Sequence, residues 1–309
     1  MSVAIIAEDF AGMRAQATGL VERAGLSWHF HPVRIEGVWR HIPTRFCPVP
    51  LRASAPIELP EDTKLLVSVG GTGGAVAAAL KRKTGLGLVQ IQNPRMAARH
   101  FDLIIANVHD EIQGANIVSA RTALHGVTVR RLDQAREVWQ SRLRISGMAL
   151  LSVLIGGANG RFSFGPDQAR ELAHDLVRIM KSSAVNVALT PSRRTSPEAL
   201  AILQESLAGH PAWIWDGQGD NPYHGLLACA DAIAVTTDSV SMISEAAATA
   251  APVWIIDLPG RSRRIASFVD TLGKEDRVRP FNGQWSPWSV TPLDDTGRAA
   301  EEMVRRLAL

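Results

Sequence analysis

The sequence is most informative at residues 230–248, which read Ala-Asp-Ala-Ile-Ala-Val-Thr-Thr-Asp-Ser-Val-Ser-Met-Ile-Ser-Glu-Ala-Ala-Ala. The apolar run at 232–235 predicts a buried strand, and the small residues after 240 predict a helix. A Thr/Asp/Ser loop separates them. This order of strand, loop and helix is the repeating unit of an α/β sheet.

The loop in this stretch also has the chemistry of a phosphate and ribose site. The N-terminus of a helix stabilises an anion through its unpaired N–H groups and its dipole. Asp238, Ser239 and Ser241 are each able to cap the helix. If Ser241 caps it, Glu245 is the fourth helical residue, and its carboxylate is free to accept the two hydroxyls of a ribose. The alternative is an ordinary capped helix with a solvated glutamate.

Short apolar runs alternate with amphipathic or Ala-rich segments along the whole chain, which predicts parallel α/β architecture. The expected strands are Val3–Ala7, Trp28–Val33, Leu65–Val69, Leu88–Ile91, Leu103–Ala106, Leu150–Ile155, Val185–Leu189, Trp213–Trp215, Ala232–Val235 and Val253–Ile256. We predict an N-terminal lobe at 1–145, a nucleotide-sugar-binding lobe at 146–290, and a final segment at 291–309 whose helix crosses back to the first lobe. The fold class is α/β, with two Rossmann-like lobes whose parallel sheets face a central cleft.

Composition narrows the class of protein. The 309 residues carry a formal net charge of +3, which is too small to indicate nucleic-acid binding. Cys47 and Cys229 are the only cysteines and lack metal-site spacing, so we expect a reducing, cytoplasmic location. The longest apolar run, at 147–158, is too short to span a bilayer.

Ligands of open α/β sheets bind beyond the carboxyl ends of the strands, so the loops at those ends are the candidate sites. Four loops of the second half carry suitable side chains or bare backbone. The candidate substrate-binding residues there are Gly156, Gly157, Arg193, Arg194, Thr195, Tyr223, Asp238, Ser239, Ser241 and Glu245. Each loop alone is equally well explained as a capped turn. Their coincidence on one sheet edge is what favours a site.

The first half offers a glycine loop and a candidate base. Gly71 and Gly73 follow the strand at 65–69, but the spacing does not fit a dinucleotide fingerprint, and we expect them to contact substrate. His109 and Asp110 follow the strand at 103–106, and a histidine beside a carboxylate is able to act as a general base. The alternatives are Glu8 and Asp9 as the carboxylates and a loop histidine bonded to backbone.

Several motifs in order along the chain resemble the mitochondrial-fission ELM1 family. They are Gln90–Arg95, His109-Asp110, Ser192–Thr195, Thr237–Ala246, Leu258–Gly260, Arg279–Phe281 and Pro292–Thr296. The resemblance implies a glycosyltransferase of the GT-B type, with the nucleotide sugar held by the C-terminal lobe, no obligatory metal and no cofactor. Residues 157–161 depart from a simple GG-S loop. The fission role of the plant members is not expected here.

We therefore expect a metal-independent transferase that moves a sugar from a nucleoside diphosphate to an unknown, envelope or lipid-linked, acceptor. His109 or Asp110 is the expected base. The alternatives are a sugar-nucleotide epimerase and a non-catalytic interaction protein. A basic segment with Trp139 predicts weak peripheral contact with an anionic membrane, unless Trp139 lies in the core; its arginines are Arg121, Arg130, Arg131, Arg136, Arg142 and Arg144.

Overall fold

The protein forms two compact α/β units. The computed structural model describes residues 2–309, except for the side chain of His109. One unit holds the chain up to Gly126 together with Asp294–Leu309, and the other holds Val127–Leu293. Each unit has its own parallel sheet and its own core.

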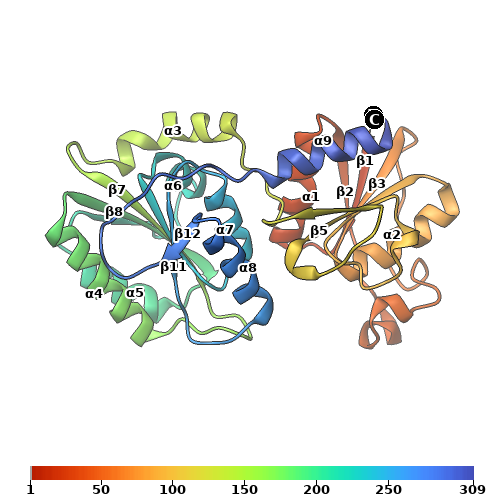
Figure 1. Ribbon diagram of the computed structural model, residues 1–309. Helices are drawn as coiled ribbons and strands as arrows, with labels where there is room; N and C mark the ends of the chain where they lie inside the picture. The colour runs from red at the N-terminus through yellow and green to blue at the C-terminus, as the bar shows by residue number, and fades with distance from the viewer. Residues whose placement is uncertain (1) are drawn as a thin grey trace. The chain divides into compact units, whose positions relative to one another are not determined.

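The first unit has a six-stranded parallel sheet in the order β2-β1-β3-β4-β5-β6 (Figure 1). Its strands are β1 (Ser2–Ala7), β2 (Ser27–Pro32), β3 (Thr63–Val69), β4 (Gly87–Ile91), β5 (Leu103–Asn107) and β6 (Ile117–Ala120). Helices α1 (Ala11–Arg23) and α9 (Asp295–Leu307) pack on one face, and α2 (Gly70–Thr84) packs on the other. Strands β1 and β3 are near-continuous apolar runs, so they have side chains to bury on both faces of the sheet.

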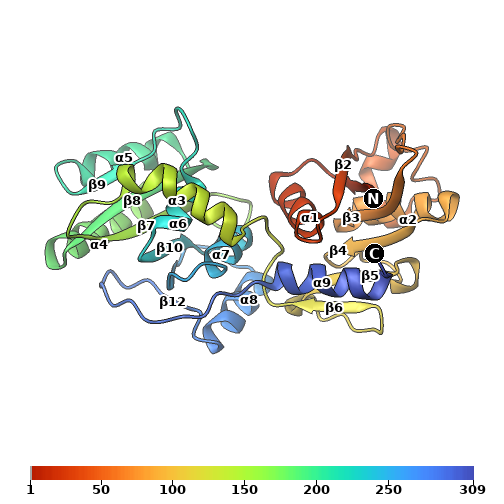
Figure 2. The same cartoon turned by 90° about the horizontal axis from the view of Figure 1, so that it is seen from above.

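The second unit has another six-stranded parallel sheet, in the order β12-β11-β10-β7-β8-β9 (Figure 2). Its strands are β7 (Ala149–Gly157), β8 (Val185–Arg194), β9 (Ala212–Ile214), β10 (Ala232–Thr236), β11 (Val253–Ile256) and β12 (Val278–Pro280). Helices α4 (Pro166–Ser182) and α5 (Pro197–Leu207) cover one face. The other face carries α3 (Val129–Leu143), α6 (Tyr223–Cys229), α7 (Val240–Ala247) and α8 (Arg263–Lys274).

The predicted fold class, two Rossmann-like lobes built on parallel sheets, is confirmed. All ten expected strands are present, and β6, β12 and helix α8 are elements that the sequence pattern did not predict. In the second sheet the strand order reverses between β7 and β10. That reversal is the topological switch point at which open α/β sheets bind ligands.

The chain enters the second unit earlier than the predicted boundary at 145/146. Helix α3 packs against α6, where a Cβ on Gly225 would lie 2.3 Å from Cγ of Trp139. The bare backbone of Gly225 lets the indole approach, so α3 belongs to the second unit. At the other end of the chain, α9 packs against α1 and β6, and the buried Asp295 accepts hydrogen bonds from Arg121 and the backbone N–H of Thr122.

No helix among residues 2–309 is both long and apolar enough to cross a membrane.

Candidate functional site

The candidate site lies at the switch point of the second sheet, where β7 and β10 end side by side. The backbone N–H of Gly156, near the end of β7, donates to Oγ1 of Thr236 at the end of β10, at 2.8 Å. This bond ties the two strand ends together, and the loops that follow are also in contact, because Nδ2 of Asn159 donates to the carbonyl oxygen of Asp238 at 3.3 Å. The predicted residues Gly156, Gly157, Asp238 and Ser239 are brought to this edge.

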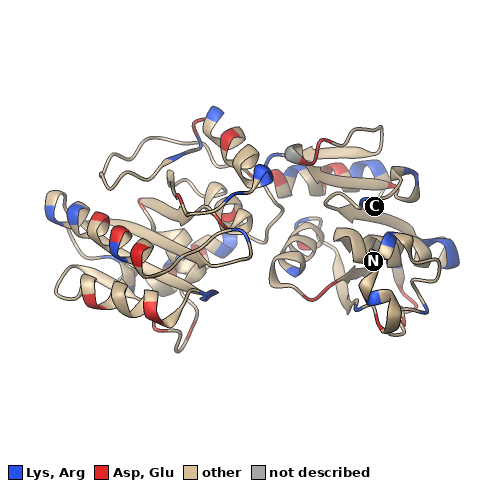
Figure 3. Ribbon diagram, turned by 90° about the horizontal axis from the view of Figure 1, so that it is seen from below, with Lys and Arg blue, Asp and Glu red and all other residues tan. Residues whose placement is uncertain are grey.

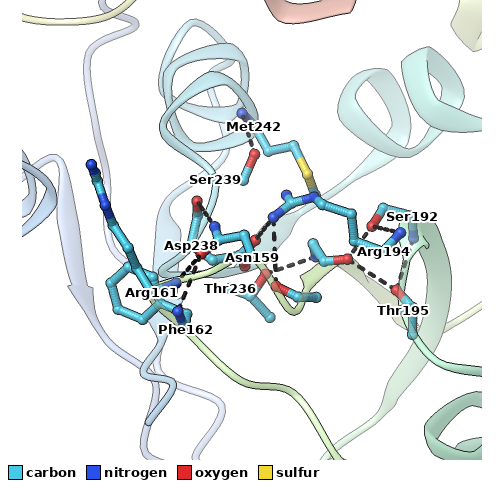
Figure 4. Close-up of polar contacts among 12 residues, drawn as sticks. Asn159, Arg161, Phe162, Ser192, Arg194, Thr195, Thr236, Asp238, Ser239 and Met242 are labelled. Atoms are coloured by element: carbon cyan, nitrogen blue, oxygen red, sulfur yellow. Dashed lines mark hydrogen bonds and ion pairs between the residues drawn. The ribbon is translucent and has the colours of Figure 1, made fainter. Parts of the chain in front are cut away.

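Asp238 is the most buried charged group of the site, with a side chain that is 0% exposed. A Cβ on Gly156 would lie 2.3 Å from its Oδ2, so only glycine at 156 leaves room for the carboxylate. Nη1 of Arg194 lies 2.6 Å from the same oxygen (Figure 4). Neither carboxylate oxygen has an aligned hydrogen-bond donor in the described part of the chain, so the ion pair with Arg194 compensates this charge.

Strand β8 closes the site on its other side. Ser192 donates from Oγ to the carbonyl oxygen of Gly156, and Thr195 donates to the same oxygen at 3.1 Å. Gly157 has a φ of 126°, and a Cβ there would lie 2.4 Å from the carbonyl oxygen of Arg194. Gly157 thus allows close approach of β7 and β8, and Gly156 leaves room for Asp238, so a diphosphate is not needed to explain either glycine.

Arg193 and Arg194 have different surroundings, although the sequence predicted both as substrate-binding residues of one loop. The sequence pattern ended the strand at Leu189, whereas β8 continues to Arg194. Because side chains alternate along a strand, the two guanidinium groups point to opposite faces. Arg194 pairs with Asp238, while Arg193 is exposed and has no partner among the described residues.

Helix α7 begins two residues earlier than expected if Ser241 were the cap and Glu245 the fourth helical residue. Ser239 is the N-cap and accepts a hydrogen bond from the backbone N–H of Met242 at 3.4 Å, and Ser241 lies inside the first turn. Asp238 is unavailable as a cap because its side chain is buried against Gly156. Glu245 is therefore the sixth helical residue.

The carboxylate of Glu245 is bonded to protein and is not free. The hydroxyl of Tyr223, the first residue of α6, donates to Oε2 of Glu245. Burial raises the pKa of Glu245 to about 7, although the Tyr223 hydrogen bond acts in the opposite direction. Burial, the charge of Glu245 and the hydrogen bond raise the pKa of Tyr223 well above its ordinary value. Tyr223 and Glu245, two candidate substrate-binding residues from different loops, thus form a hydrogen-bonded pair.

Helix α7 is fixed at its other end by a residue that the sequence did not single out. Arg277 is buried, and its Nε and Nη2 donate to the carbonyl oxygens of Ala246, Ala247, Thr249 and Ala251 at 2.8–3.1 Å. Burial lowers its pKa to about 10, so it stays charged at neutral pH. A cation at a helix C-terminus is stabilising. No spacing rule connects residue 277 with α7, so only the fold reveals this contact.

A pocket of about 860 Å³ adjoins the switch point within the second unit. Thr237 and Asp257 line it at the ends of β10 and β11, and Oγ1 of Thr237 donates to Oδ1 of Asp257 at 3.2 Å. Its volume is in the range of small-molecule sites. The pocket lining includes Thr237, the neighbour of Asp238, but neither Glu245 nor Arg194.

The candidate residues of the first unit lie in a helix and in a short turn. Gly71 and Gly73 lie in the first turn of α2 and not in a loop, because the helix begins at Gly70. A Cβ on Gly73 would lie 2.5 Å from the carbonyl oxygen of Ile6, so this glycine allows α2 to pack on β1. Asp110 ends the short turn Val108–Asp110 after β5. The side chain of His109 lies outside the described residues.

Several side chains of the basic segment at α3 contact the interior of the second unit. Trp139 is 7% exposed and packs in the core, which is the second of the two alternatives for this residue. Arg136 donates to the carbonyl oxygen of Ala228, and Arg144 donates to that of Cys229. Trp139 is therefore not available to contact a membrane, as the prediction for this helix required.

Among residues 2–309, no group of three or more His, Cys, Asp or Glu side chains is arranged to hold a metal ion. The cysteines Cys47 and Cys229 are buried and free.

A family model described as Mitochondrial fission ELM1 matches residues 11–307. The mitochondrial fission protein ELM1 of Arabidopsis thaliana is 30% identical over 273 residues, which are 79% of this chain and 64% of the plant protein. The chain thus spans less than two thirds of the length of that relative.

Solved structures share the architecture at low sequence identity. The UDP-GlcNAc 2-epimerase of Methanocaldococcus jannaschii has a TM-score of 0.63 at 12% identity, covering 100% of this chain and 99% of its own. The glycosyltransferase SnogD of Streptomyces nogalater has a TM-score of 0.55 at 14% identity, covering 100% and 95%. At these identities the likeness shows the fold alone, which is the GT-B fold.

Proposed function

This chain belongs to the mitochondrial fission ELM1 family, and we propose that it binds a nucleoside-diphosphate sugar at the switch point of its second unit. The observation that supports this most is the pair of Tyr223 and Glu245, whose carboxyl group is carried by α7, the helix that Ser239 caps at its N-terminus. Burial raises the pKa of this carboxyl group to about 7, and ionisable groups with a shifted pKa are concentrated at functional sites. The hydroxyls of a ribose are suitable donors to it.

The diphosphate is proposed to lie against the N-terminus of α7 and Arg193. The first N–H groups of the helix have no partner within the helix and favour an anion. Arg193 lies next to Arg194 at the end of β8, is exposed, and has no carboxylate partner among the described residues. Arg194 has a different proposed role, since it compensates the buried Asp238.

The proposed reaction is a glycosyl transfer. The bond between the anomeric carbon and the β-phosphate oxygen breaks, a bond to the acceptor oxygen forms, and the acceptor proton passes to a base. Charge develops on the departing diphosphate, and helix N–H groups together with Arg193 would stabilise it. We propose Asp110 or His109 as the base and an envelope or lipid-linked molecule as the acceptor, with no metal or cofactor. The buried free cysteines suit a cytoplasmic location.

Two alternatives stay open. An epimerase would also bind a nucleotide sugar but would need an acid and a base near the sugar, for which Asp9 and Asp110 are candidates. A non-catalytic interaction protein would bind no nucleotide sugar or would leave it unchanged. Analysis of the products after incubation with the bound nucleotide sugar separates these cases: an altered sugar with the diphosphate intact indicates the epimerase.

The binding proposal is tested by calorimetry with nucleotide sugars that carry uracil, guanine, adenine or cytosine. Glu245→Gln is expected to weaken binding by about 1.5–3 kcal/mol, or roughly 10- to 100-fold, because a charge-assisted acceptor is lost. The matched control is Glu205→Gln, an exposed glutamate on α5. Binding that is equally strong in both variants, or no binding of any of these compounds to the wild-type protein, contradicts the proposal.

A further inference from the structure

The connection between β2 and β3 contains a closed loop, residues 37–52, that projects from the first unit (Figure 1, orange-red). Its base is fixed by a hydrogen bond from the backbone N–H of Glu36 to the carbonyl oxygen of Ala53, at 2.8 Å. An isolated antiparallel bridge joins Ile35 to Ser54 at the same place. We name residues 37–52 the projecting loop.

One side of the projecting loop is anchored to the core of the first unit. Cys47 is buried, and Leu51 packs against the apolar core that α2 forms with the sheet. The short turn Thr44–Phe46 contacts α2. These contacts give the loop a defined conformation, so its exposed side chains have a fixed place on the surface.

The projecting loop also exposes large apolar side chains. Val38 is 74% exposed and Phe46 is 63% exposed, and Ile42 and Val49 are exposed as well. Soluble surfaces carry single exposed apolar residues without consequence, but four within twelve residues of one short loop indicate an interaction site. Trp39, also in the loop, is partly exposed, and indole rings favour the interface between bilayer and water.

The positive charge of the projecting loop indicates an anionic partner. It contains Arg40, Arg45 and Arg52 and no Asp or Glu. On the helices of both units, by contrast, acidic and basic residues are interspersed (Figure 3). The guanidinium of Arg45 lies over the ring of Phe46 at 4.7 Å, which places a cation next to an exposed aromatic ring. Cations beside apolar and aromatic groups are the composition that binds an anionic bilayer surface.

We propose that the projecting loop docks the protein onto an anionic phospholipid bilayer. Val38, Ile42, Phe46 and Val49 would enter the boundary between headgroups and acyl chains, and the three arginines would contact lipid phosphates. This surface is independent of the proposed nucleotide site, because it lies in the first unit. It also differs from the basic segment of α3, whose Trp139 is buried.

The test is sedimentation of the full chain with vesicles of phosphatidylcholine alone or with about 30 mol% phosphatidylglycerol, at about 0.15 M salt. Wild-type protein is expected to bind the anionic vesicles at least tenfold more strongly than the neutral ones. Val38→Ser/Phe46→Ser should abolish most of this binding. Arg40→Gln/Arg45→Gln should weaken it about 25-fold, since each arginine at an anionic surface contributes about fivefold.

The matched control is Val129→Ser/Val138→Ser, which removes two equally exposed valines from α3. It is expected to bind anionic vesicles as the wild type does. Equal binding to both kinds of vesicle, or equal loss in the control and in Val38→Ser/Phe46→Ser, overturns the proposal. Sedimentation velocity without lipid is the second measurement: a dimer that dissociates on Val38→Ser/Phe46→Ser would assign the loop to self-association and also overturn it. Calorimetry with nucleotide sugars should give the same affinity for all of these variants.

Discussion

Removal of Arg194 should destabilise the second unit far more than removal of its neighbour Arg193. Arg194→Met leaves the carboxylate of Asp238 with a 0% exposed side chain and no compensating cation. Breaking a buried ion pair from one side costs about 3–5 kcal/mol. Because the Arg194 side chain is itself 37% exposed, water replaces part of the lost interaction. We therefore expect the lower limit, about 3 kcal/mol.

The assay is urea unfolding of the nucleotide-free protein followed by tryptophan fluorescence. Only Trp28 and Trp39 of the eight tryptophans lie outside the second unit, so the signal reports mainly on the unit that contains the ion pair. With a denaturant slope of about 2 kcal/mol/M, the midpoint of Arg194→Met should fall by about 1.5 M. Arg193→Met is the matched control and should change the free energy of unfolding by no more than about 0.5 kcal/mol.

A second comparison isolates the pair itself. Arg194→Met/Asp238→Asn should be more stable than Arg194→Met alone, because the amide carries no charge that must be compensated. Equal midpoint shifts for Arg193→Met and Arg194→Met would refute the reasoning. So would a double variant that is less stable than Arg194→Met.

Two further predictions concern single groups. Burial raises the pKa of Glu245 from 4.5 to about 7, so the native state holds the proton more strongly than the unfolded chain. The contribution of Glu245 to the free energy of unfolding should therefore decline as the pH rises from 4.5 to about 7. The affinity for nucleotide sugar should instead rise with pH up to about 7 and then level off, since the ionised carboxylate accepts both ribose hydroxyls. Both trends are checked by calorimetry and urea titrations of the wild type and Glu245→Gln. A variant with the same pH dependence as the wild type would exclude Glu245 as the titrating group. In the first unit, Gly73→Ala places a Cβ 2.5 Å from a carbonyl oxygen of β1 and should cost about 1–3 kcal/mol. Gly71→Ala has its nearest atom at 3.8 Å and should cost less than Gly73→Ala in the same unfolding experiment; the reverse order would contradict the packing argument.

The sequence predicted the strands of both sheets because buried parallel strands are continuous apolar runs with turn residues at their ends. It missed β6 and β12, which are edge strands of only four and three residues and are too short to stand out as apolar runs. Helix α8 had a readable signal, namely the cap Ser262 followed by apolar residues at 265, 268 and 272. Its basic first turn concealed this pattern.

The candidate site was predictable as a set of loops but not as a set of contacts. Strand ends locate residues such as Gly156 and Asp238 on one edge, and local spacing suffices for that. Which oxygen caps α7 depends on whether Asp238 is already buried, and that depends on a glycine about eighty residues earlier. The pairing of Tyr223 with Glu245 likewise joins two helices whose relation only the folded sheet establishes.

The same contacts explain how the proposed ribose site is held before any ligand arrives. Ser239 caps the first turn of α7, and Arg277 binds the carbonyl groups at its end, so the backbone that carries Glu245 is fixed on both sides. A carboxylate on a fixed helix binds a ligand without a cost for ordering the backbone. The hydroxyl of Tyr223 holds one carboxylate oxygen in the free protein, and a ribose hydroxyl would have to replace or share that bond. Tyr223→Phe therefore separates two effects: it frees the carboxylate for ribose and removes the donor that stabilises its ionised form. A tighter complex in Tyr223→Phe means that competition for the oxygen dominates, and a weaker one means that stabilisation of the charge does.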